Sequence, residues 1–124
     1  MLSYAETGDL LDAMAEELPE EFFNDLNGGI VLLPQSKLHP ESGGGDVYIL
    51  GEYHRDAVLG RRIVIYYGSF EAVYPLAGRE AVTRELRKTL RHEFTHHIES
   101  LAGERGLERK DEEDMLRYYF GHYR

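Results

Sequence analysis

The chain has 124 residues, 42% of them hydrophobic and 30% charged, which is the composition of a folded protein with one modest core. We therefore expect a single domain spanning residues 1–124. The net charge of −9 disfavours nucleic acid and anionic membrane surfaces as partners, because both bind basic proteins. The lack of cysteine excludes disulfides and thiolate ligands, so any metal site must use His, Asp, Glu or water.

The N-terminus predicts a cytoplasmic protein. It lacks the basic region and the long apolar run of a secretory signal. No apolar stretch of the sequence approaches the roughly 20 residues that cross a bilayer.

The first third of the chain predicts two helices and a strand. Residues 3–18 have apolar side chains at helical spacing, and Ser3 and Glu6 fit a capping box at the start. A proline then ends this helix and opens a short second helix over residues 19–26. The apolar run at residues 30–33 predicts a short strand.

The middle of the chain predicts a loop and a hairpin. Residues 34–46 contain two prolines and three consecutive glycines, which are typical of an exposed loop. Residues 47–53 and 61–67 are rich in β-branched and aromatic side chains, so we expect an antiparallel hairpin. Gly68 is predicted to close the second strand, and a connection through Phe70, Tyr74 and Pro75 then leads to Gly78.

A long helix is predicted from Gly78 to about Ala102, where no glycine or proline interrupts. Gly103 is predicted to end it, and a last helix is predicted from about Asp111. One face of the long helix carries an apolar stripe: Leu86, Leu90, Phe94, Ile98 and Leu101. The whole order predicts an α+β domain, in which a small, mostly antiparallel sheet packs against this helix between N- and C-terminal helices.

Residues 92–96 of this helix read His-Glu-Phe-Thr-His, an HExxH pentapeptide. Two imidazoles four residues apart project to the same side of a helix, so His92 and His96 can chelate one divalent metal ion. Glu93 lies beside that metal, where its carboxylate can take a proton from a metal-bound water and pass it to a leaving amine. We predict one Zn²⁺ ion with Glu93 as catalytic base. The competing interpretation is an ordinary polar helix face.

The third zinc ligand is left open by the sequence. Glu99 is the first candidate, because it falls within about 20° of His92 around the helix. Its axial offset from His92 is about 10 Å, so it has to lean back to reach the metal. Glu104, Glu108 and Asp111 are the other candidates, and for Asp111 a helix cap is an equal explanation.

Other polar side chains of the sequence have structural and functional interpretations. His97 is on the motif helix but faces the apolar stripe, so we expect a structural residue. The first half of the helix is basic: Arg79, Arg84, Arg87, Lys88 and Arg91. We expect ion pairs within an acidic chain, with a site for an acidic substrate group as the weaker alternative. Several side chains are candidate donors to a transition state, and the sequence selects none: Tyr66, Tyr67, Tyr118, Tyr119, His122 and Tyr123.

Two segments together resemble a known family. Residues 61–68 read Arg-Arg-Ile-Val-Ile-Tyr-Tyr-Gly, and residues 89–97 read Thr-Leu-Arg-His-Glu-Phe-Thr-His-His. They resemble the small bacterial zincin-like metallopeptidases, also called minimal zincins, over about residues 45–101. The resemblance implies a compact α+β fold, with the motif helix on a small mixed sheet and an edge strand along the cleft. It also implies the two motif histidines as ligands and the motif glutamate as base.

The chain departs from that family downstream of the motif. The family pattern continues as HxxGxxD, whereas here Glu99 stands three residues after His96 and the first glycine is Gly103. The sequence thus favours a zinc-dependent, peptidase-like hydrolase that acts on a peptide or protein extended along a sheet edge. The alternative is a non-catalytic module of the same fold, which binds metal or a protein partner.

Overall fold

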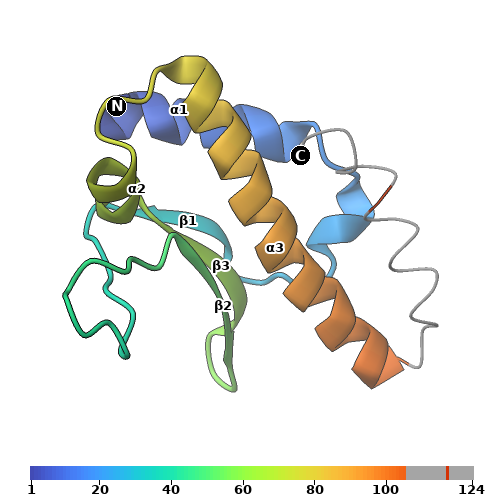
Figure 1. Ribbon diagram of the computed structural model, residues 1–124. Helices are drawn as coiled ribbons and strands as arrows, with labels where there is room; N and C mark the ends of the chain where they lie inside the picture. The colour runs from blue at the N-terminus through green and yellow to red at the C-terminus, as the bar shows by residue number, and fades with distance from the viewer. Residues whose placement is uncertain (106–116, 118–124) are drawn as a thin grey trace.

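The computed structural model describes residues 1–105 and residue 117, and its architecture is α+β (Figure 1). A three-stranded sheet packs against one long helix, and a shorter helix crosses near the N-terminal end of the long one. The elements follow in this order: α1 (Tyr4–Glu16), η1 (Glu20–Phe23), β1 (Gly29–Leu33), β2 (Gly51–Asp56), β3 (Gly60–Tyr66), α2 (Tyr67–Val73) and α3 (Arg79–Arg105). None of the described helices is long and apolar enough to cross a membrane.

The N-terminal helix α1 begins at the predicted capping box. The Ser3 Oγ atom accepts a hydrogen bond of 3.1 Å from the Glu6 backbone N–H, and Glu6 Oε1 accepts one of 3.0 Å from the Ser3 N–H. These two bonds satisfy backbone donors that a helix start otherwise leaves unpaired. The helix ends at Glu16, and the short helix after Pro19 is the 3₁₀ helix η1.

The sheet is mixed, whereas the sequence predicted a mostly antiparallel one. Strand β3 is central and pairs with β2 antiparallel, as predicted, and with β1 parallel. Strand β2 begins at Gly51 rather than at residue 47. The reason is that Val47 and Ile49 pair with an earlier segment: His39 N–H donates to Val47 O and Ile49 N–H donates to Lys37 O, both at 2.8 Å.

The sequence assigned no secondary structure to the connection after β3, and the helix α2 lies there. Gly68 lies inside α2 and does not close a strand. A Cβ atom at Gly68 would lie 2.5 Å from the Ser36 backbone nitrogen and 2.7 Å from the Gln35 carbonyl carbon. Gly68 is therefore required for close packing of the helix against the preceding loop.

The long helix α3 carries the predicted apolar stripe, and all five of its members are buried. All of them except Leu101 form one core with side chains from the sheet and from the N-terminal half, among them Phe22, Ile63, Ile65 and Phe70. The predicted stop at Gly103 is wrong, since α3 continues to Arg105. A glycine in an exposed helix costs only about 1 kcal/mol, which does not end a well-packed helix. The last helix predicted from Asp111 falls outside the described residues.

Candidate metal centre

The three functional residues of the HExxH motif lie together in the middle of α3. The Nε2 atoms of His92 and His96 are 3.1 Å apart, and both side chains are exposed. The imidazole rings meet nearly at right angles, with centroids 4.7 Å apart. One ligand atom from each of His92, Glu93 and His96 can be chosen so that all lie within 4.8 Å of one another.

This spacing fits a zinc ion. Two ligand nitrogens at 2.0–2.1 Å from a tetrahedral zinc ion lie about 3.3 Å apart. The observed separation of 3.1 Å between the two Nε2 atoms is slightly shorter than that value. Small rotations of the two side chains can make up the difference. The two histidines are therefore spaced so that one divalent metal ion could contact both.

Glu93 differs from the histidines in its environment, because only 4% of its surface is exposed. Burial, and secondarily the charge of Glu52, raises the pKa of the Glu93 carboxyl to about 7. The pKa of His92 moves the opposite way: burial and the neighbouring His96 lower it, while the charge of Glu99 partly opposes them. At neutral pH His92 is thus a neutral imidazole able to ligate, and Glu93 can both accept and release a proton.

Of the four candidates for the third ligand, the structure describes the side chain of Glu99 alone, and it does not place Glu99 with the motif residues. Glu99 is exposed, and its carboxylate is not part of the His92–Glu93–His96 group. It acts on His92 through its charge alone. The side chain of Glu104 and the whole of Glu108 and Asp111 lie outside the described residues.

His97 is structural, as its helix phase indicates. Its ring is fully buried, with Nε2 2.8 Å from the Asn24 carbonyl oxygen and Nδ1 2.8 Å from the Tyr53 hydroxyl. A carbonyl oxygen only accepts, so Nε2 carries the proton and Nδ1 accepts from Tyr53. Both ring nitrogens are thereby occupied away from the metal site.

A cleft runs between the start of β2 and the motif helix. It is a hollow of about 340 Å³ lined by Tyr48, Ile49, Leu50, Gly51, Glu85, Lys88, Thr89, His92 and Glu93. The wall on the strand side approaches α3 closely, because Gly51 has no side chain. A Cβ atom there would lie 2.7 Å from Thr89 Cγ2 and 3.2 Å from the Val64 carbonyl oxygen.

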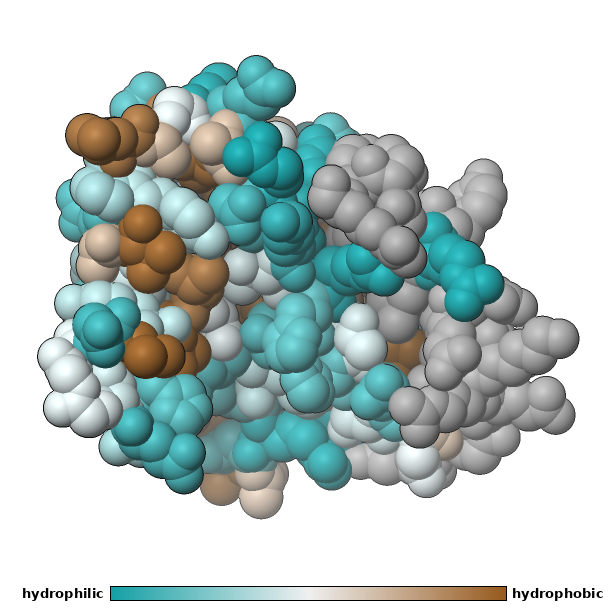
Figure 2. All heavy atoms as spheres, in the orientation of Figure 1, coloured by the Kyte–Doolittle hydropathy of each residue, from teal (hydrophilic) through white to brown (hydrophobic). Residues whose placement is uncertain are grey.

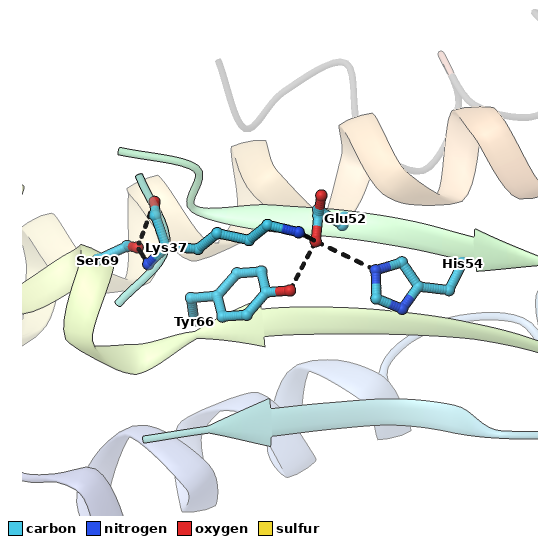
Figure 3. Close-up of polar contacts among 5 residues, drawn as sticks. All are labelled: Lys37, Glu52, His54, Tyr66 and Ser69. Carbon is cyan, nitrogen blue, oxygen red and sulfur yellow. Dashed lines mark hydrogen bonds and ion pairs between the residues drawn. The ribbon is translucent and has the colours of Figure 1, made fainter. Parts of the chain in front are cut away.

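A cluster that the sequence did not predict fixes this wall. The Glu52 Oε1 atom accepts hydrogen bonds from Tyr66 Oη (2.6 Å), Lys37 Nζ (2.7 Å) and His54 Nε2 (3.1 Å), as Figure 3 shows. Lys37 is also held by its backbone, since its N–H donates to Ser69 Oγ at 2.9 Å. The cluster thus joins the loop before β2 to β2, β3 and α2.

Burial alone raises the pKa of the Glu52 carboxyl, but the hydrogen bonds from Lys37, Tyr66 and His54 outweigh it and lower the pKa to about 2. Glu52 is therefore charged throughout the physiological range. No local pattern of the sequence marks this cluster. The partners of Glu52 lie 2 to 15 residues away along the chain, and two of the three come from other segments of the fold.

The other predicted candidates are placed as follows. Tyr66 is engaged by Glu52, and the Tyr67 hydroxyl donates to the Leu2 carbonyl oxygen at 2.6 Å, so neither is directed to the metal site. The remaining donor candidates, Tyr118, Tyr119, His122 and Tyr123, lie outside the described residues. Ion pairing explains part of the basic half-helix, because Arg87 pairs with Glu17 at 3.4 Å.

Comparison with known proteins gives one informative match. No protein-family model matches the chain, and no curated protein does. A solved structure described as a conserved hypothetical protein (TTHA0227) from Thermo thermophilus is similar, with a TM-score of 0.68. The two sequences are 37% identical, and the match covers 82% of this chain and 99% of that chain. The chain belongs to the family of this conserved hypothetical protein.

Proposed function

We propose that the protein is a zinc-dependent, peptidase-like hydrolase with a zincin-like fold. The observation that carries the proposal is the placement of two exposed imidazoles, 3.1 Å apart at Nε2, beside the buried Glu93 carboxylate at a cleft. If His92 and His96 were ordinary surface histidines, nothing would require a buried carboxylate next to them. The combination of ligands, base and cleft is what hydrolysis of a peptide bond requires.

His92 and His96 would hold the zinc ion. When bound, zinc supplies Lewis-acid chemistry, which lowers the pKa of a water molecule and polarises a carbonyl group. The chain itself supplies the proton transfer. Because its pKa is about 7, the Glu93 carboxylate can take a proton from the attacking water and return it to the leaving amine at neutral pH.

The edge strand β2 would align the substrate. In the described sheet, β2 pairs on one side only, and its start lines the cleft together with His92 and Glu93. An extended peptide can add to such an edge through its backbone. The cluster around Glu52 holds that wall in place, so its position does not depend on the substrate.

One observation favours a second function, a non-catalytic module that binds a protein partner in the same cleft. Glu99 is not part of the His92–Glu93–His96 group, and the hydrolase needs Glu93 as its base, so within the described residues only the two imidazoles are left as dedicated ligands. Two histidines alone hold zinc weakly. This alternative predicts peptide binding without hydrolysis.

The two functions are separated by measuring metal content and peptide cleavage together. We expect one zinc ion per chain in the wild type, and cleavage of a quenched fluorescent peptide library. Glu93→Gln should keep the metal but lose at least about a hundredfold in cleavage rate. Glu80→Gln, at an exposed glutamate in the first turn of α3, is the matched control and should match the wild type. Stoichiometric zinc with no cleavage by the wild type would exclude the hydrolase.

A further inference from the structure

We propose that the cleft selects peptides in which a carboxylate follows or precedes an apolar side chain. This inference rests on the proposed peptidase-like function and names its substrate class. Two features next to His92 carry it: an apolar rim formed by the segment before β2 and a pair of cations on α3.

The apolar rim is formed by the segment that leads into β2. Tyr48, Ile49 and Leu50 line the 340 Å³ hollow beside His92 and Glu93. The rim continues onto the surface, where Val47 and Leu38 are 52% and 46% exposed. Figure 2 shows hydrophobic surface on the side of the molecule where residues 38–50 lie. An exposed apolar patch next to a cleft is typical of a binding site for an apolar group.

The cations are Lys88 and Arg91 on α3. With His92 and Thr95 they line a second hollow of about 320 Å³. Both hollows include Lys88 and His92, so they adjoin at the candidate metal ligand. Figure 2 shows this helix as a hydrophilic band beside the apolar region.

The two cations differ in their partners. The Lys88 side chain is half exposed and forms a salt bridge of 3.5 Å with Glu85, a carboxylate that it shares with Arg84. Among the acidic side chains that the structure describes, none forms a salt bridge with Arg91. Its planar guanidinium is therefore available to bind both oxygens of a carboxylate, and the half-exposed Lys88 can add a second contact.

The basic segment of α3 contrasts with the net negative charge of the whole chain. At a net charge of −9 the protein repels acidic peptides at long range. Residues 79–91 nevertheless hold five of the 14 basic residues and only two acidic ones. A preference for an acidic peptide therefore requires local basic contacts, and this helix supplies them beside the cleft. The carboxylate can belong to an Asp or Glu side chain, or to the C-terminus of the peptide.

The test is a binding measurement on the full-length Glu93→Gln variant, so that no peptide is consumed. The probes are dye-labelled, acetylated peptides of leucine and glycine with asparagine at one position, scanned along the peptide. They are compared with the same peptides carrying aspartate at the scanned position. They are also compared with asparagine peptides that end in a free carboxylate instead of a C-terminal amide. Fluorescence anisotropy gives Kd at about 0.05 M and about 0.5 M salt.

We expect aspartate, in at least one position, or the free C-terminus to tighten binding about three- to tenfold at low salt, and less at high salt. Lys88→Gln and Arg91→Gln should each reduce this advantage. The matched control Arg84→Gln, one turn earlier on α3 and outside both hollows, should keep it. Ile49→Ser should weaken the binding of all leucine peptides.

The proposal is overturned if no peptide binds, if a carboxylate gives no advantage at any position, or if Arg84→Gln removes the advantage as fully as Arg91→Gln. Failure of the hydrolase proposal is seen separately, in the zinc content and cleavage rate of the wild type. Selective binding without cleavage would keep the recognition site and assign it to a binding module.

Discussion

The Tyr53 hydroxyl lies 2.8 Å from Nδ1 of His97, and this contact joins edge strand β2 to the helix that carries the candidate metal ligands. His97 lies one residue beyond the motif and faces away from the metal site. On the other side of the ring, Nε2 donates to the Asn24 carbonyl oxygen. The His97 ring thus links three segments of the chain while its neighbour His96 stays exposed.

Removing this link should destabilise the protein without affecting metal. Tyr53→Phe leaves the buried Nδ1 acceptor of His97 unpaired, which costs about 1–3 kcal/mol. We expect urea denaturation of the metal-free variant to show that loss, and the zinc content to stay at the wild-type value. If Tyr53→Phe instead loses zinc but keeps its stability, the result would indicate that His97 belongs to the metal site. The ¹⁵N shifts of the ring should report a proton on Nε2.

The opposite pattern is expected for the two motif histidines. His92→Ala or His96→Ala should weaken zinc binding on the order of a hundredfold or more, exceeding the effect of losing an outer-shell partner. Since both side chains are exposed, the free energy of unfolding without metal should change by at most about 0.5 kcal/mol. Isothermal titration with zinc and urea denaturation measure the two quantities. His39→Ala, at an exposed histidine outside the site, is the control.

The Glu52 cluster predicts a stability that depends on pH. The pKa of Glu52 is about 2 when folded, against 4.5 as the ordinary value. Between these values the unfolded chain binds more protons, so the contribution of Glu52 is complete above about pH 5 and is lost as the pH falls toward 2. Glu52→Gln should therefore lower the free energy of unfolding by about 1–2 kcal/mol at pH 7, allowing for the partly exposed side chain.

Denaturation of wild type and Glu52→Gln across this pH range measures the effect. The two stabilities should converge at the acid end. Glu41→Gln, at an exposed residue, should follow the wild type at every pH. A constant difference between Glu52→Gln and the wild type would show that the charge of Glu52 is not its cause.

The close approach of β2 to α3 can be tested by adding a side chain at Gly51. Gly51→Ala places a methyl group 2.7 Å from Thr89 Cγ2, and overpacking of this kind typically costs about 1–3 kcal/mol. Thr89→Ser removes that methyl group and retains a hydroxyl, which donates to the Glu85 carbonyl oxygen in the wild type. We expect the double variant to recover part of the lost stability in thermal denaturation. Additive losses would place the conflict elsewhere, at the Val64 carbonyl or Ile65.

Features set by neighbours along the chain could be predicted from the sequence. The capping box at Ser3, the apolar stripe of α3 and the pairing of His92 with His96 each depend on residues three or four positions apart, and a helix fixes how these meet. The hairpin of β2 and β3 was predicted for the same reason, because a short turn joins its strands.

Features set by distant segments could not be predicted. Gly68 has the appearance of a strand end, yet its role depends on Gln35 and Ser36, about 33 residues away. The parallel pairing of β1 with β3 joins residues more than 30 positions apart, and no local pattern encodes it. The Glu52 cluster depends on such contacts too, since Lys37 and Tyr66 lie 15 and 14 residues from Glu52. The sequence therefore supplied candidate ligands and a candidate base, but not the cluster beside them.

The residue types in β2 have a consequence for the state of the protein at high concentration. An unpaired strand edge can pair with the same edge of another molecule, which leads to aggregation. Strand β2 reads Gly-Glu-Tyr-His-Arg-Asp, so it offers charged side chains of both signs where most strands carry aliphatic ones. Charged residues on an edge discourage such self-pairing. The same residues that make β2 a poor strand former thus keep its edge available to a different chain.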